Sequence, residues 1–423
     1  RLGLRFRYDS TYDLATLRVS LYDPPHLLGH PAVLDMPPFL FATSCTLEAP
    51  LLAENVMVGY GLRALPVDYG RRMFFPDKEQ ERDYPFGLFL QAAGVSHGRG
   101  RVLAFTDSTV FSNFTMFLGG KPEFFLGAMN WLNHAERWPW LDGVLLVVGL
   151  LAAGGSAYVA RHLNRQRAGI VVLGALLLAF AIGPWTSRKV VRMRYELPAP
   201  HTAHTTIAFE GEHSRMELPI RPAPSPPELS YQTFYVWTQR LGYVPTYAPN
   251  LYEALERGQI VVLINPATPL SHEEMEALTR YVEGGGRLLL LVDPQDGAVP
   301  REIASRILSP FGLGVEARQP TTGAVYNSAG EELGNLRVSG LVSGGQPLLT
   351  LEGRATILAW TRHGEGLVAA SAFAWPFSDR EMGNTAVVPN EHQRSLFEIE
   401  YWLLRSLVSG EFVPLQIPGT AAD

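Results

Sequence analysis

The sequence predicts an α/β protein with two related parallel-sheet domains, the first one incomplete, joined by a two-helix transmembrane hairpin. Three observations indicate this class. Two apolar runs lie back to back in the middle of the chain, strand and helix patterns alternate after residue 230, and a short segment is repeated. A chain of 423 residues has room for two or three domains beside such a hairpin.

The apolar runs are residues 143–160 and 168–185, and neither contains a charged residue. As a helix each would span about 27 Å, close to the hydrocarbon core of a bilayer. Neither run keeps the polar stripe of a soluble surface helix. The alternative is a helical hairpin buried in a large soluble core. The residues expected at the membrane interface are Trp138, Trp140, Trp185, Arg161, Arg165 and Arg167.

The arginines between the two runs predict that this connection faces the cytoplasm. We therefore expect a multi-pass protein of the bacterial inner (cytoplasmic) membrane, with its soluble domains on the extracytoplasmic side. In this organisation residues 138–190 form the hairpin, and residues 191–230 form an extended, proline-rich linker.

The second soluble domain is expected at residues 231–409, followed by an irregular tail at 410–423. The runs QIVVLINP and RLLLLVDP are continuously apolar, which is typical of strands covered on both faces. Between them, Ser271 and Glu274 form a capping box that predicts a helix over 272–283, ended by three glycines. Alternating strands and helices with short links predict a parallel sheet with right-handed crossovers.

An internal repeat relates residues 97–113, HGRGRVLAFTDSTVFSN, to residues 363–379, HGEGLVAASAFAWPFSD. Aligned without a gap, both contain HGxGxVxA and end in FS followed by Asn or Asp. Each copy predicts a turn, a buried strand, a loop and a covering helix. The first domain, 1–137, would then be only the closing part of an α/β domain, with an insertion near 54–86. Its opening strands would lie upstream or come from another subunit.

The segment VVLINPATPLSHEEMEALTRYVEGGGRLLLLVDP, together with the repeated HG.G.V.A block, resembles a known family. It is similar to the glutamine-amidotransferase-like (class I, flavodoxin-like) domains of bacterial membrane-anchored proteins. Among these are auxiliary subunits of gliding-motility-type ABC transporters and related membrane proteins of unknown function. The resemblance covers residues 231–407 and part of 1–134, and it implies a fold more than an activity.

The chemistry of true amidotransferases is not expected here. They need a cysteine nucleophile at a sharp strand-to-helix turn, and this chain has Asp293, Pro294 and Gln295 at the corresponding position. The single cysteine, Cys45, lies in a strand-like stretch and reads as a buried thiol. No serine-nucleophile or phosphate-loop motif occurs, so no cofactor is expected. A formal charge of −6 without a basic patch argues against nucleic acid.

Open α/β sheets bind ligands beyond the carboxyl ends of their strands. The alternative is that polar residues at those ends only form turns and caps. The candidate ligand-binding residues are Asn265, Thr268, Asp293, Gln295, Asp107 and Asp379. No metal site is expected. The histidines considered for one are His201, His204 and His213, whose spacing in a proline-flanked loop fits a solvated segment better than a zinc site.

Together these observations predict a non-catalytic, membrane-anchored binding or scaffold subunit of a larger membrane complex. Its expected partners are membrane lipid and other membrane-protein subunits. One alternative is an accessory subunit of an ABC-type exporter, with a separate ATPase and permease. The other is a metal-dependent or carbohydrate-active hydrolase.

Overall fold

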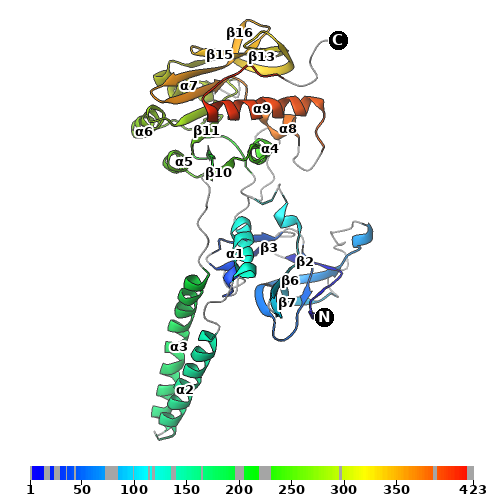
Figure 1. Ribbon diagram of the computed structural model, residues 1–423, viewed down its shortest axis with the longest axis vertical. Helices are drawn as coiled ribbons and strands as arrows, with labels where there is room; N and C mark the ends of the chain where they lie inside the picture. Colours follow the sequence, from blue (N-terminus) through cyan, green and yellow to red (C-terminus); the bar gives the residue numbers. More distant parts are fainter. Residues whose placement is uncertain are drawn as a thin grey trace. The chain divides into compact units, whose positions relative to one another are not determined.

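In a computed structural model, the chain folds into two compact units, residues 1–200 and 201–423 (Figure 1). The structure describes residues 2–13, 20–22, 29–34, 36–41, 44–71, 84–98, 100–112, 115–116, 120–134, 140–162, 165–195, 204–218, 230–294, 298–383 and 388–416.

The first unit contains a four-stranded antiparallel sheet in the order β2–β6–β7–β8. Two short antiparallel pairs, β1 with β5 and β3 with β4, accompany it. The strands are β1 (Arg5–Phe6), β2 (Asp9–Asp13), β3 (Ser20–Tyr22), β4 (Phe39–Phe41), β5 (Leu47–Glu48), β6 (Glu54–Pro66), β7 (Phe86–His97) and β8 (Gly100–Phe105). The 3-10 helices are η1 (Pro31–Val33), η2 (Tyr69–Arg71) and η4 (Thr109–Phe111).

Helix α1 (Lys121–Asn133) closes the aromatic core of this unit. Its buried Phe124 packs against Phe39 and Phe105, with ring centroids 5.6 Å and 4.9 Å away. The helix approaches η1 so closely that a Cβ on Gly127 would lie 2.5 Å from the carbonyl oxygen of Ala32. Only glycine permits this contact without displacing the backbone.

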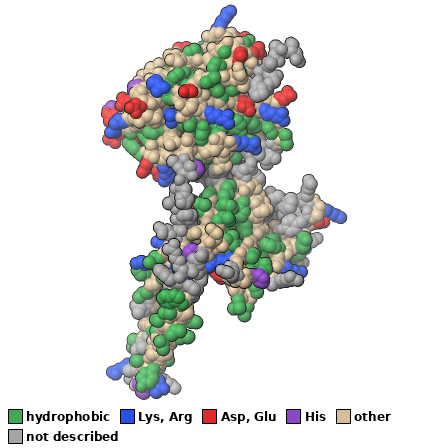
Figure 2. Space-filling view, viewed as in Figure 1, with side chains coloured by type: hydrophobic (Ala, Val, Ile, Leu, Met, Phe, Trp, Pro, Cys, Tyr) green, Lys and Arg blue, Asp and Glu red, His purple; other side chains and the backbone are tan. Residues whose placement is uncertain are grey.

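Two further helices follow, α2 (Leu141–Arg161) and α3 (Arg165–Arg194). Hydrophobic side chains cover much of their visible surface (Figure 2). Among the described residues, one helix is long and apolar enough to cross a membrane, over Arg167–Arg194, and none of its apolar stretch is buried. The apolar part of α2, Gly143–Val159, is shorter, and a span needs about 20 residues. The predicted two-helix transmembrane hairpin was therefore wrong.

The second unit is built on a nine-stranded mixed sheet in the order β10–β9–β11–β12–β17–β16–β15–β13–β14. Strands β10, β9, β11, β12 and β17 are parallel, and the remaining four continue the sheet with antiparallel pairs. The strands are β9 (Thr206–Glu210), β10 (Val244–Ala248), β11 (Ile260–Ile264), β12 (Arg287–Leu291), β13 (Gly314–Asn327), β14 (Glu332–Ser343), β15 (Gln346–Leu351), β16 (Ala355–His363) and β17 (Gly366–Ser371).

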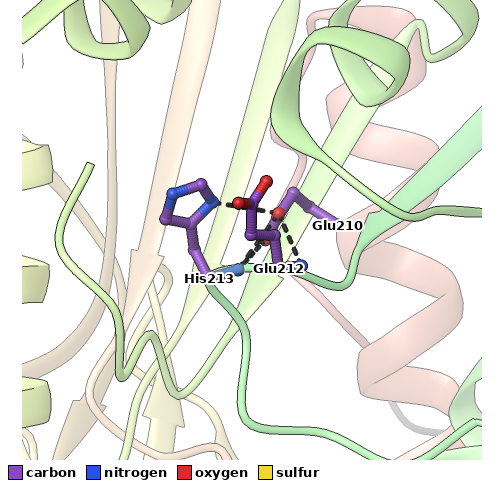
Figure 3. Close-up of side chains that lie close together, drawn as sticks. All are labelled: Glu210, Glu212 and His213. Atoms are coloured by element: carbon purple, nitrogen blue, oxygen red, sulfur yellow. Dashed lines mark hydrogen bonds and ion pairs between the residues drawn. The ribbon is translucent and has the colours of Figure 1, made fainter. Parts of the chain in front are cut away.

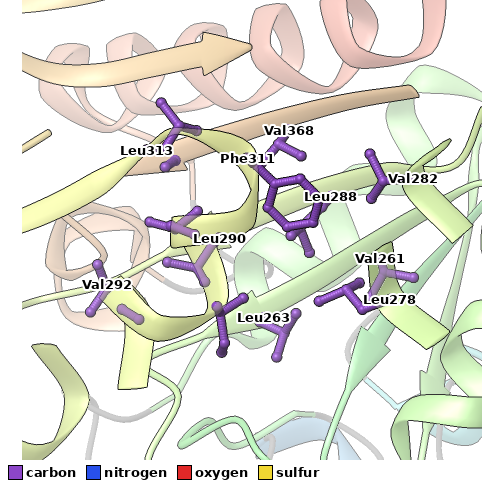
Figure 4. Close-up of a cluster of buried hydrophobic side chains, with 14 of the residues drawn as sticks. Val261, Leu263, Leu278, Val282, Leu288, Leu290, Val292, Phe311, Leu313 and Val368 are labelled. Carbon is purple, nitrogen blue, oxygen red and sulfur yellow. The ribbon is translucent and has the colours of Figure 1, made fainter. Parts of the chain in front are cut away.

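Helices cover both faces of the parallel strands. On one face, side chains of β11, β12 and β17 form a core with α5, α6, α7 and η6 (Figure 4). On the other face, Phe209 of β9 contacts Tyr235 of α4, and Trp237 of α4 stacks on Phe397 of α9. The helices are α4 (Gln232–Trp237), η5 (Thr238–Leu241), α5 (Leu251–Arg257), α6 (His272–Glu283), α7 (Ala298–Leu308), η6 (Ser309–Phe311), η7 (Trp375–Phe377), α8 (Asp379–Met382) and α9 (Glu391–Ser409).

The expectation of two related parallel-sheet domains was also wrong. Both repeat copies form a hairpin turn, a strand and a 3-10 helix, namely β8 with η4 and β17 with η7. Strand β8, however, is the edge of an antiparallel sheet, whereas β17 lies between parallel β12 and antiparallel β16. The repeated residues specify the local hairpin. They do not determine which strand, if any, pairs with the other edge of β8 or β17.

Candidate functional site

Several of the expected ligand-binding residues, together with Glu210, lie at or near the carboxyl ends of the parallel strands in the second unit. Glu210 ends β9, Asn265 follows β11, and Asp293 follows β12, whereas Asp379 begins α8, in the segment that comes after β17 and η7. Three of them are buried, with exposed fractions of 0% for Glu210, 2% for Asn265 and 5% for Asp293. A buried polar group must find hydrogen-bond partners, so the partners decide what these side chains can do.

The carboxylate of Glu210 is enclosed by the turn that follows β9 (Figure 3). It accepts hydrogen bonds from the backbone N–H groups of Glu212 at 2.8 Å, His213 at 3.0 Å and Ser214 at 3.2 Å. The Nδ1 of His213 lies 3.0 Å from the same carboxylate. Because an ionised carboxylate only accepts hydrogen bonds, this ring nitrogen is the donor. The turn is thus folded around a buried charge.

His213 connects this turn to helix α6. Its Nε2 lies 3.6 Å from Oε2 of Glu274, which also receives the backbone N–H of Ser271 in the capping box. The hydrogen bond to Glu210 raises the pKa of His213, against the opposing effect of burial, and the charge of Glu274 adds to the rise. Burial would raise the pKa of Glu274, but hydrogen bonds from Ser271 and the charge of His213 lower it below its usual value.

The same residues are of the types that bind metal ions. Among the described residues, Glu210, Glu212 and His213 offer ligand atoms within 4.8 Å of one another. Both oxygens of Glu210 already accept N–H groups, and Nδ1 of His213 carries a proton toward them. A ligating imidazole nitrogen must instead be free of its proton. These residues therefore fit a hydrogen-bonded turn and do not fit a cation. His204 is exposed and outside the group, and His201 lies outside the described residues.

Asn265 and Asp293 lock neighbouring strand ends together. Asn265 has a left-handed backbone, with φ of 47°. Its amide nitrogen donates to the hydroxyl of Tyr231 at 3.0 Å, and its oxygen accepts the backbone N–H of Asp293 at 2.7 Å. The carboxylate of Asp293 accepts the hydroxyl of Ser339 at 2.8 Å and the backbone N–H of Ala374 at 3.2 Å. Both side chains are thus engaged in holding the sheet edge.

The other candidates of the second unit differ in their surroundings. Asp379 accepts the hydroxyl of Ser230 and, at 2.7 Å, the backbone N–H of Thr233, so it ties the start of α4 to α8. Thr268 is exposed. Gln295 lies outside the described residues.

Asp107 belongs to the first unit and is buried at the end of β8. Its carboxylate accepts the backbone N–H of Thr109 at 2.8 Å, which begins η4. The nearby Lys121 is only 1% exposed, and burial lowers the pKa of its ammonium group to about 8, although the charge of Asp107 opposes this shift. Asp107 therefore stabilises the turn that leads into η4, and its charge acts on the buried Lys121.

Five of the six residues expected at the membrane interface lie on or beside α2 and α3. Trp140 and Trp185 are exposed, and so are Arg161 and Arg167. Trp185 contacts the ammonium group of Lys189, which lies 5.2 Å from its ring centroid. The side chain of Arg165 and all of Trp138 lie outside what the structure describes.

The sequence reasoning missed Glu210 and Glu274 as partners of His213. The sequence identified Glu274 through its capping box, and it shows Glu210 three residues before His213. Only the folded sheet, however, places α6 beside the turn that contains His213. It also missed a groove of about 850 Å³ between α6 and α7. The groove is lined by apolar side chains such as Met275 and Pro310 and by two arginines, Arg280 and Arg306.

A mixed sheet, half of whose strand pairs are parallel, with helices on both faces of the parallel strands and an internally hydrogen-bonded carboxyl edge, defines an α/β domain. Residues 225–386 match the model of a family described as a domain of unknown function (DUF4350). No curated protein matches the chain by sequence.

Solved structures show distant similarity. They include exo-beta-1,4-mannosidase Op5Man5 from Opitutaceae bacterium strain TAV5, with 15% identity and a TM-score of 0.32, covering 53% of this chain and 38% of the enzyme. The chain thus spans less than half of that enzyme's length. The mmIFT52 N-terminal domain has 14% identity and a TM-score of 0.35, covering 48% of this chain and 98% of that domain. Cytoplasmic protein STM1381 from Salmonella typhimurium LT2 has 13% identity and a TM-score of 0.33, covering 48% of this chain and 99% of that protein.

Proposed function

We propose that this chain is a non-catalytic, membrane-anchored binding or scaffold subunit of a larger complex at the bacterial cytoplasmic membrane. The observation that carries the proposal is the exposed apolar surface of α3. Over Arg167–Arg194 the helix is long enough to cross a bilayer, and none of its apolar stretch is buried in protein. Side chains such as Leu173 and Leu177 are 58% and 61% exposed. Lipid is the solvent that makes such a surface favourable.

The hydrogen bonding at the carboxyl edge supports a non-catalytic role. Catalytic groups need an approach for substrate and a free lone pair or proton at the reacting atom. Glu210, Asn265 and Asp293 are buried, and their polar atoms bind backbone groups and hydroxyls of the same unit. These side chains hold the fold together. The groove between α6 and α7, lined by apolar side chains together with Arg280, Arg306 and Glu276, offers a surface for a partner.

Membrane anchoring by α3 can be tested with a paired substitution, Leu173→Arg with Leu177→Arg. Each arginine at the centre of a span costs about 3 kcal/mol in insertion free energy, and each lost leucine costs about 0.5 kcal/mol more. The double variant should therefore lose about 7 kcal/mol of insertion free energy. The measurement is the fraction of protein that stays with membranes after an alkaline carbonate wash.

The matched control places the same change on an exposed turn, Leu51→Arg with Leu52→Arg, where the side chains are 99% and 93% exposed. The parent and this control should stay in the membrane fraction, while the α3 variant should leave it. Release of the parent by carbonate would overturn the proposal, as would equal retention of the α3 variant.

A further inference from the structure

The segment 411–416 follows α9 and lies in a groove of the second unit. It has neither helix nor strand structure. Gly410, with a left-handed φ of 79°, ends the helix and redirects the chain. The side chain of Leu415 is then only 4% exposed, while Glu411, Val413, Pro414 and Gln416 are exposed. The segment therefore uses some of its side chains as anchors and leaves the others to solvent.

Phe412 is the first anchor, and it lies between two tryptophans from different elements. Its ring stacks on Trp360 of β16, with centroids 4.7 Å apart and planes inclined by 27°. Trp402 of α9 meets the same ring edge-on, at 6.3 Å and 73°. Aromatic pairs in these arrangements stabilise beyond their buried area. Leu415 is the second anchor, three residues further on.

The groove also binds the backbone of the segment. The indole N–H of Trp402 donates to the carbonyl of Val413 at 2.6 Å, and the side-chain amide of Asn327 donates to the carbonyl of Leu415 at 2.7 Å. The oxygen of Asn327 accepts the backbone N–H groups of Ala329 and Glu331, both at 2.9 Å. These two bonds fix the orientation of the amide group, so that its nitrogen faces the segment. The nitrogen binds a main-chain carbonyl, so this bond does not depend on the side chains of the segment.

This arrangement has the parts of a peptide-recognition site. Donors from the folded body bind main-chain carbonyls, which any peptide offers, and pockets for spaced side chains set the preference. A cavity of about 570 Å³ adjoins the segment and is lined in part by Tyr243, Tyr401 and Arg405. The groove therefore has room beside its present occupant.

We propose that this groove is a binding site for an extended peptide with an aromatic residue and a leucine three positions later. Residues 411–416 occupy it as a ligand in cis, and a partner segment of the same pattern displaces them. The site would let the second unit dock a linear segment of another protein. This inference does not depend on α3 or on membrane anchoring.

The test uses the full-length chain in detergent and a fluorescent peptide with the sequence of residues 410–419, GEFVPLQIPG. The protein variant Phe412→Ala with Leu415→Ala removes both anchors from the resident segment. Fluorescence anisotropy should show that this variant binds the peptide at least tenfold more tightly than the parent does. A peptide with alanine at both anchor positions should not bind to either protein.

Two further variants make the result specific. Adding Trp402→Phe keeps a ring but removes the N–H donor, so it should weaken peptide binding severalfold. Phe412→Ala alone keeps one anchor, so it should give intermediate binding, and it serves as the test if the double variant does not fold. Equal binding by parent and folded variants would overturn the proposal, and so would equal binding of the alanine peptide.

Discussion

Replacing Glu210 with glutamine should lower the stability of the second unit, and by more than the same substitution at the neighbouring Glu212. The buried carboxylate receives the backbone N–H groups of Glu212, His213 and Ser214 as well as Nδ1 of His213. A glutamine keeps one oxygen and turns an NH₂ group toward backbone N–H groups, which cannot accept a hydrogen bond. The shape of the side chain hardly changes, so the effect reports hydrogen bonding and charge.

The magnitude follows from the bonds that fail. A hydrogen bond to a charged group contributes about 1.5–3 kcal/mol. At least two of the four cannot form with glutamine, so the free energy of unfolding should fall by about 3–6 kcal/mol. For a unit of this size, 1 kcal/mol shifts Tm by about 2–4 °C. The expected decrease in Tm is therefore about 6–24 °C.

The assay is thermal unfolding of the full chain in detergent, followed by tryptophan fluorescence. Glu212→Gln is the matched control, because that side chain is exposed and only its backbone N–H contacts Glu210. The control should shift Tm by less than about 2 °C, since exposed substitutions change stability by about 0.5 kcal/mol or less. Equal shifts for the two variants would refute the reasoning. Stabilisation of the parent by added Zn²⁺, lost in Glu210→Gln, would refute it as well and indicate a metal site.

Three further results are expected. The pKa of His213 is raised in the folded state, mainly by its hydrogen bond to Glu210. Its contribution to stability is therefore complete below about pH 6.5 and is lost as the pH rises through the raised pKa. A His213→Gln variant should show a flatter dependence of Tm on pH above about pH 6.5, and an unchanged slope would contradict this. Leu290→Ala removes a fully buried side chain and should cost about 3–5 kcal/mol in urea unfolding, whereas Leu51→Ala, on an exposed turn, should cost almost nothing. Gly127→Ala should cost about 1–3 kcal/mol, because its Cβ would meet the backbone of η1, and a neutral result would show that α1 can move away.

The parallel core of the second unit was predictable from the sequence. The apolar runs around Val262 and Leu289 form β11 and β12, which pair in parallel and are buried except for Arg287 at the start of β12. The capping box of Ser271 and Glu274 begins α6 at the expected residue. These signals are local: continuous apolar residues indicate a strand covered on both faces, and the cap fixes where a helix begins.

The rest of the sheet depends on contacts between distant residues. Residues 314–363 form four antiparallel strands, β13 to β16, which the sequence analysis did not anticipate. Their alternating side chains give a weaker signal than a continuous apolar run, because only half of the positions are apolar. The repeat was misleading for a related reason, since β8 and β17 share their hairpins but have different outer neighbours.

The candidate site was predictable as a place on the sheet, but its chemistry was not. Position alone suggested that Asn265 and Asp293 lie at the strand ends, as they do. Their partners, Tyr231 and Ser339, come from remote parts of the chain, and only the fold reveals that they satisfy the polar atoms. His213 was considered with other histidines, whereas the structure pairs it with two glutamates.

The location of β17 determines when the second unit can be completed during synthesis. Its parallel neighbour β12 leaves the ribosome first, and the chain then passes through α7 and four antiparallel strands before residues 366–371 appear. At ordinary elongation rates, roughly several seconds pass during which the apolar edge of β12 that pairs with β17 has no partner strand. Exposed strand edges invite pairing with other chains. Nascent polypeptides stalled within this interval should therefore recruit chaperones or precipitate, whereas those that have emerged beyond Ser371 should acquire protease resistance abruptly.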